Sequence, residues 1–293
     1  MSNVGHSTSE YAEALEDSRI TRQDASRWMQ VAKVPEERMQ EVIQAVKDEG
    51  KELTTAGFLR LAKEVTNKKK SEQEQERTAM RAEIAQVGAA IPMSDRWNIY
   101  QGDIRTIELN KKYDYIITDP PYPREYIWTY EELANRATEW LKPGGLLIAM
   151  AGQSYLDEIY EVMSASLEYY WTAAYLTPGQ PTPLRHVNTN TTWKPLLMFK
   201  RQDDVYKGKI FGDVFKSDGN DKDFHKWGQS ESGMYDIISK ICLPGQSILD
   251  PFCGAGTTGI AALKYGCLFD GIELLEENVN ISKARLNDAT AQR

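Results

Sequence analysis

Asp119-Pro120-Pro121-Tyr122 follows directly after the run Tyr113-Asp114-Tyr115-Ile116-Ile117-Thr118. That run is short, apolar and rich in β-favouring residues, so it predicts a buried strand. Two successive prolines cannot continue the hydrogen-bond ladder of a sheet, so the strand has to end at Asp119. One carboxylate and one aromatic ring are thereby expected on a stiff turn at the carboxyl end of a strand, where open α/β sheets bind ligands. Taken alone, the stretch is also compatible with a rigid loop that has no function.

The composition describes a globular protein of the α/β size range. Its 293 residues suffice for one large domain, or for one domain with a small accessory one. Hydrophobic residues make up 41% of the chain and charged residues 27%, which excludes general disorder. No run of about 18 apolar residues occurs, and the first six residues form no apolar signal core. We therefore expect no membrane partner and a cytoplasmic location, in a bacterial or phage-infected cell.

The cysteines, the histidines and the net charge argue against a disulfide framework, a metal site and broad electrostatic binding of nucleic acid. The three cysteines (Cys242, Cys253, Cys267) are far apart, which favours buried thiols in a reducing compartment over a disulfide framework or a zinc site. With three histidines in the chain, we expect no histidine metal centre. The formal net charge of −8 argues against broad electrostatic clamping of nucleic acid but leaves room for a local basic groove.

Residues 1–66 predict a helical accessory domain. Apolar residues recur with helical spacing in two stretches, Met39-Val42-Ile43-Val46 and Phe58-Leu61-Ala62-Val65. Thr54 or Thr55 can cap the last helix, and Pro35 suits the first turn of the middle one. The segment 20–35 is loosely similar to helix-turn-helix pieces of phage and plasmid partition or replication proteins. DNA binding and dimerisation, giving a homodimer, are both open roles for this domain.

Residues 67–92 predict a solvated linker helix, because the composition changes there to Asn67-Lys-Lys-Lys-Ser-Glu-Gln-Glu-Gln-Glu-Arg77. From residue 93 to 293 strands and helices alternate, which predicts a mainly parallel sheet covered by helices. We expect helices at 131–141, 156–167 and 257–265, and one ending at 241. Further strands are expected at 97–100, 146–151, 169–176, 193–200, 247–250 and 268–274, with Lys142-Pro-Gly-Gly145 closing the first of these helices.

Asp250-Pro-Phe-Cys-Gly-Ala-Gly-Thr-Thr258 predicts a strand that runs into a glycine-rich turn and a helix. The glycines allow a tight turn and the close approach of a ligand, and the helix start offers free N–H groups. Gly254, Gly256 and Gly259 match Gly-x-Gly-x-x-Gly, and Glu273 follows as a ribose-binding acid should. The pattern favours a ligand with an adenosine ribose, either a dinucleotide or S-adenosylmethionine. Because little chain follows Gly259, the remaining strands must come from upstream, so the sheet is circularly permuted.

The order of these motifs resembles the β-class DNA amino-methyltransferases, which modify adenine N6 or cytosine N4, above all their phage and mobile-element forms. The resemblance covers roughly residues 97–286 and implies a circularly permuted, Rossmann-like methyltransferase sheet with S-adenosylmethionine as cofactor. The matching pieces are Gly102-Asp103, Asp119-Pro120-Pro121-Tyr122, His225-Lys-Trp-Gly-Gln-Ser230, Asp250 to Thr258 and Gly271-Ile-Glu273.

The resemblance also implies roles for individual residues. Asp119 and the carbonyl of Pro120 would accept the hydrogens of the target amino group, with Pro121 fixing the turn and Tyr122 stacking on a flipped base. Tyr126, Trp128 and Tyr130 would either help to hold the base or pack their loop down. The residues implied to bind the cofactor are Asp103, Gln229, Ser230, Asp250, Phe252, Cys253, Gly254, Gly256, Thr257, Thr258 and Glu273. In the family the fourth motif usually reads His-Pro-Thr-Gln-Lys-Pro, and here Ser230 and Glu231 replace its Lys-Pro.

A basic stretch is expected to contact DNA. The family's recognition region corresponds to about 201–224, which is short and suggests a short or relaxed target. Residues 181–216 hold seven lysines and arginines against three aspartates, with aromatic residues interleaved. This suits phosphate contacts and base stacking beside the catalytic face, although a solvated surface is the alternative. The candidate DNA-binding residues are Arg185, Lys194, Arg201, Lys207 and Lys209.

The sequence thus predicts a site-specific DNA adenine-N6 methyltransferase. Aspartate in the first position of the catalytic motif favours adenine in this family, whereas serine there is commoner for cytosine N4. The alternatives are a cytosine-N4 enzyme, an RNA adenine-N6 enzyme, and a DNA-binding regulator that keeps the domain as a scaffold. A nicotinamide dehydrogenase is disfavoured by the permutation.

Overall fold

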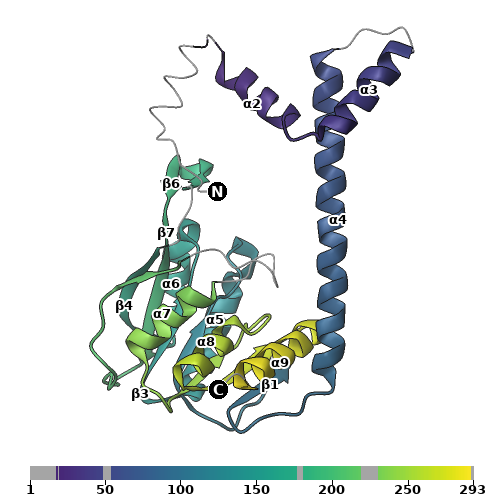
Figure 1. Ribbon diagram of the computed structural model, residues 1–293. Helices are drawn as coiled ribbons and strands as arrows, with labels where there is room; N and C mark the ends of the chain where they lie inside the picture. Colours follow the sequence, from purple (N-terminus) through teal and green to yellow (C-terminus); the bar gives the residue numbers. More distant parts are fainter. Residues whose placement is uncertain (1–17, 19, 49–53, 177–180, 219–229, 292–293) are drawn as a thin grey trace. The chain divides into compact units, whose positions relative to one another are not determined.

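The computed structural model describes residues 18, 20–48, 54–176, 181–218 and 230–291 (Figure 1). The chain divides into two compact units, residues 1–78 and residues 79–293. In the described part of the chain, no helix is both long enough and apolar enough to cross a membrane.

In its described residues, the first unit holds helices α2 (Arg22–Val31), α3 (Glu36–Asp48) and about the first two thirds of α4 (Thr55–Ala89). Thr54 caps α4 by accepting a hydrogen bond from the Gly57 N–H at 3.1 Å, as its residue type predicts. Pro35 lies just before α3, not inside its first turn, and its carbonyl accepts the Met39 N–H at 3.0 Å. A small apolar cluster forms around Val34, Leu61 and Ala62, and the periodic residues Met39, Val42 and Val65 pack on it.

Helix α4 continues without a break from Thr55 to Ala89, through the segment predicted to be a linker helix. Its last turns belong to the second unit, where they dock on α9 (Glu276–Ala291). Arg81 binds Glu277 and Asn278 there. Gly88 allows the close approach, because a Cβ at this position would lie 1.8 Å from the Asn280 carbonyl oxygen.

The second unit is built on a mixed sheet, which in the described residues has eight strands in the order β1-β10-β9-β2-β3-β7-β4-β8. Neighbouring strands from β1 to β3 are parallel, β7 is antiparallel to both of its neighbours, and β8 is parallel to β4. The strands are β1 (Trp97–Gln101), β2 (Tyr113–Thr118), β3 (Leu141–Met150), β4 (Leu167–Leu176), β7 (Trp193–Arg201), β8 (Val214–Lys216), β9 (Ser247–Asp250) and β10 (Leu268–Glu273).

The sheet confirms the predicted permutation. Strand β9, which precedes the glycine loop late in the chain, lies directly beside β2, whose end carries Asp119. Strands β1 and β10, which are far apart in the sequence, pair over their whole length from Trp97–Phe269 to Gln101–Glu273. The half of the sheet next to β2 is therefore assembled from both ends of the unit.

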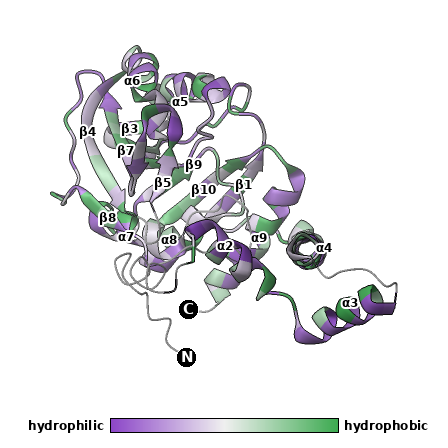
Figure 2. Ribbon diagram, turned by 90° about the horizontal axis from the view of Figure 1, so that it is seen from above, coloured by the Kyte–Doolittle hydropathy of each residue, from purple (hydrophilic) through white to green (hydrophobic). Residues whose placement is uncertain are grey.

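Helices cover both faces of the sheet (Figure 2). One core lies between the sheet and helices α7 (Glu231–Ile241), α8 (Thr257–Tyr265) and α9, and contains Ile117, Ile148 and Ile248. The other core lies under α5 (Ile127–Trp140) and α6 (Leu156–Ser164), with Ile116 and Leu147 facing it. The strands β2 and β3 read as apolar runs because both of their faces are buried.

Three local predictions differ from the structure. Strand β3 begins at Leu141, so Lys142-Pro-Gly-Gly145 is an irregular part of the strand and not the turn that closes α5. Pairing moves from Tyr113–Leu141 to Tyr115–Leu146, which leaves these residues bulging out of the ladder. Helix α5 begins and ends earlier than expected, and α6 begins at Leu156 as expected but ends earlier, at Ser164. A two-stranded hairpin, β5 (Thr182–Leu184) with β6 (Thr189–Thr191), was not predicted.

Candidate active site

The carboxyl ends of five neighbouring strands bring the predicted motifs to one edge of the sheet. Along the order β1-β10-β9-β2-β3, the strands end at Gln101, Glu273, Asp250, Thr118 and Met150. Asp103 follows β1, the glycine loop follows β9, and Asp119 follows β2. Because β7 runs antiparallel, its start at Trp193 and Lys194 lies at this same edge. The sheet order therefore places the two halves of the site side by side, with β9 next to β2.

Asp119 is held by the tyrosine of its own motif. The Tyr122 hydroxyl donates a hydrogen bond to Asp119 Oδ1, across three residues of the proline turn. Burial, followed by the charge of Asp119, raises the pKa of Tyr122 well above its usual value, so this hydroxyl stays protonated and remains the donor. Pro120 is buried while Asp119 and Tyr122 are half-buried, which leaves the carboxylate and the ring within reach of a ligand.

Lys194 completes this contact from β7. Its Nζ donates to the Tyr122 hydroxyl oxygen at 3.3 Å and lies 5.1 Å from the centre of the Tyr122 ring. An ammonium over an aromatic face is attracted by the negative face of the ring. Lys194, Tyr122 and Asp119 therefore form a short polar chain from β7 to the end of β2.

The aromatic residues after the catalytic motif differ in how far they are buried. Tyr130 is a buried residue of α5 and donates to the Met150 carbonyl at 3.0 Å, so it packs the helix on the end of β3 and does not face a base. Tyr126 and Trp128 each keep 40% of their surface exposed. Gly152, which follows β3, faces Tyr122: a Cβ there would lie 3.2 Å from the Tyr122 Cβ. Glycine thus makes room for the position that Tyr122 takes.

Asp250 is buried at the end of β9, with 3% of its surface exposed. Its Oδ1 accepts hydrogen bonds from Thr118 Oγ1 at 2.6 Å and the Phe252 N–H at 3.1 Å, and its Oδ2 accepts one from Thr258 Oγ1 at 2.6 Å. Burial raises the pKa of this carboxyl to about 6, the three hydrogen bonds oppose the rise, and the charge of Asp119 adds to it. The carboxylate predicted to bind the cofactor is therefore engaged within the protein.

The glycine loop combines an open position with two closed ones. Gly254 has a φ of +53° and no heavy atom within 4 Å of the place where a Cβ would stand, so its surroundings admit a ligand. Gly256, the residue before α8, has a φ of +81°, which favours glycine. Gly259 packs in the core, where a Cβ would lie 2.5 Å from the Phe269 ring. Thr257 is half-buried at the start of α8, where N–H groups lack helical partners.

Phe252 and Cys253, which begin this loop, differ in burial and therefore in the role they can take. Phe252 is half-buried and packs partly on the core under α5 and α6. Cys253 is buried, and a Cβ on Gly271 would lie 2.7 Å from its sulfur. Burial raises the pKa of the Cys253 thiol well above its usual value, so it is a neutral core group. All three cysteines are buried and unpaired, as predicted.

Glu273 ends β10 next to the glycine loop. Its Oε1 accepts the Leu275 N–H at 2.8 Å, which fixes the side chain before α9 begins. The residue is half-buried, so the carboxylate remains in reach of a ligand at the sheet edge. Exposed Leu274 and Leu275 follow, with 60% and 59% of their surface accessible.

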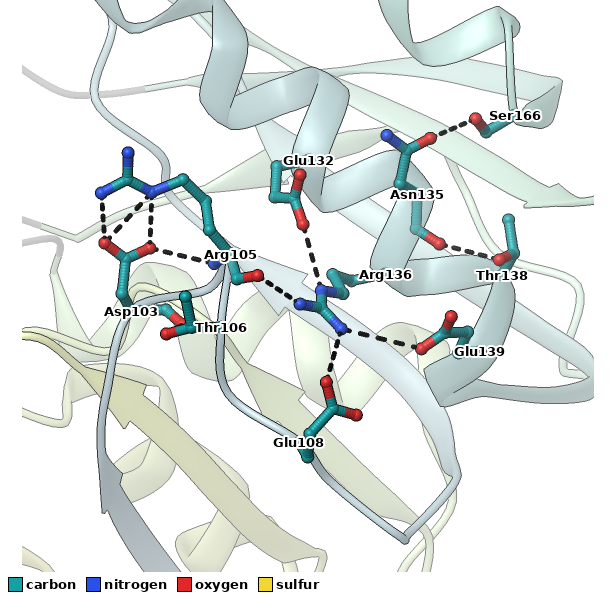
Figure 3. A network of polar contacts seen from close by, with 10 residues as sticks. All are labelled: Asp103, Arg105, Thr106, Glu108, Glu132, Asn135, Arg136, Thr138, Glu139 and Ser166. Atoms are coloured by element: carbon teal, nitrogen blue, oxygen red, sulfur yellow. Dashed lines mark hydrogen bonds and ion pairs between the residues drawn. The ribbon is translucent and has the colours of Figure 1, made fainter.

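Asp103 is engaged by an arginine (Figure 3). Arg105 Nε lies 3.0 Å from Asp103 Oδ1, and Arg105 NH2 lies 2.5 Å from Oδ2. The hydrogen bonds from Arg105 lower the pKa of the Asp103 carboxyl to about 2. Arg136 on α5 holds this loop by donating to the Arg105 carbonyl at 2.5 Å, and Arg105 itself stacks 4.8 Å from the Trp128 ring centre. Asp103 thus lies at the predicted edge, but with its carboxylate already paired.

The fourth motif is only partly described. His225 and Gln229 lie outside the described residues. Ser230 is buried just before α7, and its hydroxyl oxygen lies 2.7 Å from that of Ser232.

The predicted DNA-binding residues are divided between opposite edges of the sheet. Arg185 is exposed in the 3-10 turn of the β5–β6 hairpin, and Lys194 is at the edge of the site. Arg201 reaches the Leu141 carbonyl at the start of β3, Lys207 packs on Gly144, and Lys209 binds the Ser239 carbonyl at 2.8 Å. For these three, the expected place beside the catalytic face is wrong, because β7 runs antiparallel and carries the chain to the amino ends of the parallel strands.

Sequence reasoning missed several residues that shape the site. The contacts of Thr118 and Gly152 with the site are seen only once the strands are placed. Arg105 pairs with Asp103, and Arg136 holds the loop after β1 by donating to the Arg105 carbonyl. Thr118 directly precedes the catalytic motif, which is the one signal that could have drawn attention to it.

Comparison with known proteins shows what the chain resembles. Residues 200–284 match the family model described as DNA methylase. The chain is 26% identical over 193 residues to "Putative methylase YubD" of Escherichia coli (strain K12), covering 59% of this chain and 81% of the relative. It is 34% identical over 102 residues to the Type II methyltransferase M2.DpnII of Streptococcus pneumoniae, covering 35% of this chain and 37% of that protein. The crystal structure of the M1.HpyAVI–SAM complex superposes with a TM-score of 0.54 at 26% identity, covering 65% of this chain and 99% of that one.

These similarities support an amino-methyltransferase of the DNA methylase family. The methyltransferase also shares its fold with the PvuII DNA methyltransferase, which is cytosine-N4-specific, at 14% identity and a TM-score of 0.52, covering 68% of this chain and 93% of that one. The fold therefore does not choose between the target bases.

Proposed function

We propose that this methyltransferase transfers a methyl group from S-adenosylmethionine to N6 of a flipped-out adenine in DNA. The observation that carries the proposal is the position of Asp119 and Tyr122 at the end of β2, one strand away from the glycine loop. A methyl donor in the loop and an amino group at Asp119 would meet between these two neighbouring strands.

The residues of the β9–β10 half fit such a cofactor. The open surroundings of Gly254 allow the close approach of a ligand, and the first N–H groups of α8 face the same edge. Glu273 presents a carboxylate where a ribose would bind, and Phe252 offers a half-buried ring beside it. When bound, S-adenosylmethionine supplies an electrophilic methyl group on a positively charged sulfur.

The other half of the site activates the target nitrogen. The lone pair of an exocyclic amine is delocalised into its ring, so the nitrogen is a poor nucleophile as it stands. Asp119 is placed to accept one amino hydrogen and the Pro120 carbonyl to accept the other. Two such acceptors favour a tetrahedral nitrogen and stabilise the positive charge that develops on it during transfer.

Tyr122 links base entry to this activation. A base has to leave the double helix to reach Asp119, and an aromatic ring beside the carboxylate offers it a stacking surface. In the described conformation, the Tyr122 hydroxyl already donates to Asp119 Oδ1. The incoming amino group therefore has to share or displace this donor, and Lys194 is placed to stabilise the released hydroxyl oxygen.

The choice of adenine rests on the aspartate in the first position of the catalytic motif. The test is transfer of labelled methyl from S-adenosylmethionine to unmethylated DNA, followed by digestion and identification of the labelled nucleoside. We expect N6-methyladenine. N4-methylcytosine would keep the mechanism and refute the base assignment, and label in RNA alone would refute the DNA assignment.

The Asp119→Ala variant tests whether transfer is the biological role. An enzyme would lose methyl transfer and its effect in cells together, while a regulator with a methyltransferase scaffold would keep the effect. Residues 1–66 are proposed as an accessory domain that contacts DNA or forms a homodimer. Analytical ultracentrifugation of the full chain with and without duplex DNA would separate these two roles.

A further inference from the structure

We propose that Asp250 is a positioning residue, whose carboxylate fixes the strand end that carries Asp119 relative to the helix start that follows the glycine loop. The inference rests on the proposed function, since it assigns the register between the methyl donor and the target amine to one side chain. In this view Asp250 acts through Thr118 and Thr258 and touches neither reactant.

The hydrogen bonds of Asp250 join three segments of the site. Thr118 is the last residue of β2 and the neighbour of Asp119 in the chain. Thr258 lies in the first turn of α8, and Phe252 lies in the loop between β9 and that helix. The carboxylate accepts from all three, with 2.6 Å to each threonine hydroxyl. One buried group therefore ties the catalytic turn to both ends of the glycine loop.

An ionised carboxylate is suited to this task because it only accepts hydrogen bonds. Three donors converge on its two oxygens, and a protonated carboxyl or an amide would bring a donor of its own to one of them. The group is 97% buried, so these bonds are not exchanged with water. The arrangement is costly for the fold, since burial disfavours the charge, and this cost points to a function in the ionised form.

The hydrogen bond from Thr118 to Asp250 affects the position of Asp119, because Thr118 is its neighbour in the chain. A shift of the β2 end moves Asp119 directly, because the two residues share a peptide bond. Misplacement of a reacting group by about 1 Å can reduce a rate by about 100-fold. Ligand binding at the glycine loop should depend far less on this bond, since Glu273 ends β10 on the far side of β9 from β2, and the bonds from Phe252 and Thr258 to Asp250 remain.

The acidic neighbours of Asp250 determine its response to pH. Asp119 faces it from β2, and Cys253 faces it from the loop, with Glu273 acting on the same cysteine from β10. Neither acid stabilises the charge of Asp250. The hydroxyls of Thr118 and Thr258 do so, and loss of either one should make the carboxylate easier to protonate.

The test compares Thr118→Val with Thr118→Ser in the full chain. Valine keeps the shape and removes the hydroxyl, whereas serine keeps the hydroxyl. We expect the valine variant to lower kcat about 10- to 100-fold. Its Kd for S-adenosylhomocysteine, measured by calorimetry, should stay within about 3-fold of the wild-type value, and the serine variant should restore most of kcat. Thr290→Val, which removes a hydroxyl bonded within α9, is the matched control and should change neither quantity.

The pH profile of kcat separates positioning from general destabilisation. Removal of the Thr118 bond should move the acid limb of the profile to higher pH, and serine should move it back. Equal kcat and equal acid limbs in the wild type and the valine variant would overturn the role of Asp250. A fall in kcat that serine does not rescue, with a lower Tm and weaker cofactor binding, would overturn it too. A wild-type chain that methylates no nucleic acid would overturn the proposed function together with this inference.

Discussion

Replacing Asp250 by asparagine should stabilise the protein at neutral pH while it slows the reaction. The pKa of this carboxyl is about 6 in the folded chain and 3.8 in the usual reference state. Each pH unit between the two values corresponds to about 1.4 kcal/mol, so ionisation of Asp250 in the fold costs about 3 kcal/mol above pH 6. Asparagine carries no charge and has nearly the same shape. Its NH2 group can replace Oδ2, where the Thr258 hydroxyl can turn to accept, so most of this cost should disappear.

The sign of the effect follows from the raised pKa. Protonated Asp250 favours the folded state, so its contribution to stability is fully present below about pH 4 and is lost as pH rises through about 6. The difference in unfolding free energy between Asp250→Asn and wild type should therefore be about 3 kcal/mol at pH 7.5 and close to zero near pH 4. In a domain of this size, about 3 kcal/mol corresponds to a rise in Tm of about 6–12 °C.

Urea and thermal unfolding of the full chain measure this difference, followed by tryptophan fluorescence, because Trp97 and Trp140 are buried in the second unit. Asp103→Asn is the control of opposite sign: Arg105 lowers the pKa of Asp103 to about 2, so its contribution is present at neutral pH and is lost on acidification. An Asp250→Asn variant that is less stable than wild type at pH 7.5 would refute the reasoning, because the three hydrogen bonds would then outweigh the cost of the buried charge.

Substitutions at Tyr122, Lys194 and Gly259 test other parts of the structure, with Arg201 as a control position. Tyr122→Phe keeps the stacking ring and removes the donor to Asp119, so we expect a change in kcat of less than about 10-fold. Tyr122→Ala also removes the ring, and it should raise the KM for DNA about 5- to 150-fold, which corresponds to about 1–3 kcal/mol of lost stacking. Steady-state methyl transfer measures both quantities. Lys194→Gln should weaken DNA binding and reduce the slope of log K against log salt by about 1, while Arg201→Gln should leave that slope unchanged, as fluorescence anisotropy would show. Gly259→Ala should destabilise the fold by about 1–3 kcal/mol in urea unfolding, because the new Cβ would lie 2.5 Å from the Phe269 ring.

Much of the fold was predictable because β2, β3 and β9 are buried on both faces and read as short apolar runs. The permutation followed from chain length after Gly259, and the pairing of β9 with β2 confirms it. The extension of β3 to Leu141 was not predictable, since Pro-Gly-Gly usually ends an element. Its bulge is held by tertiary contacts, among them the Gly144 N–H donating to Asp204 at 2.7 Å. The β5–β6 hairpin escaped notice because its strands are three residues long.

The candidate site was predictable as a set of motifs but not as a set of contacts. Asp119, Tyr122 and the glycines are visible as residue types in a fixed order. Which atoms a carboxylate touches depends on neighbouring strands, so Asp103 and Asp250 gave no sign of their partners Arg105 and Thr118. The place of the basic stretch was not predictable for a related reason. Charge counted along the chain ignores the antiparallel direction of β7, which carries Arg201 and Lys207 away from Lys194.

The order of motifs in the chain is free because the register of a sheet does not depend on how its strands are connected. What the reaction requires is that the end of the β2 strand and the loop after β9 are neighbours in space. In this protein their neighbourhood is secured by backbone pairing, Tyr115 with Ile248 and Ile116 with Leu249, and by the side-chain bond from Thr118 to Asp250 beyond the last pair. A permuted chain can place these strands in either sequence order and keep both contacts. The contacts between β2 and β9, more than the order of the motifs, are therefore where selection for catalysis should act.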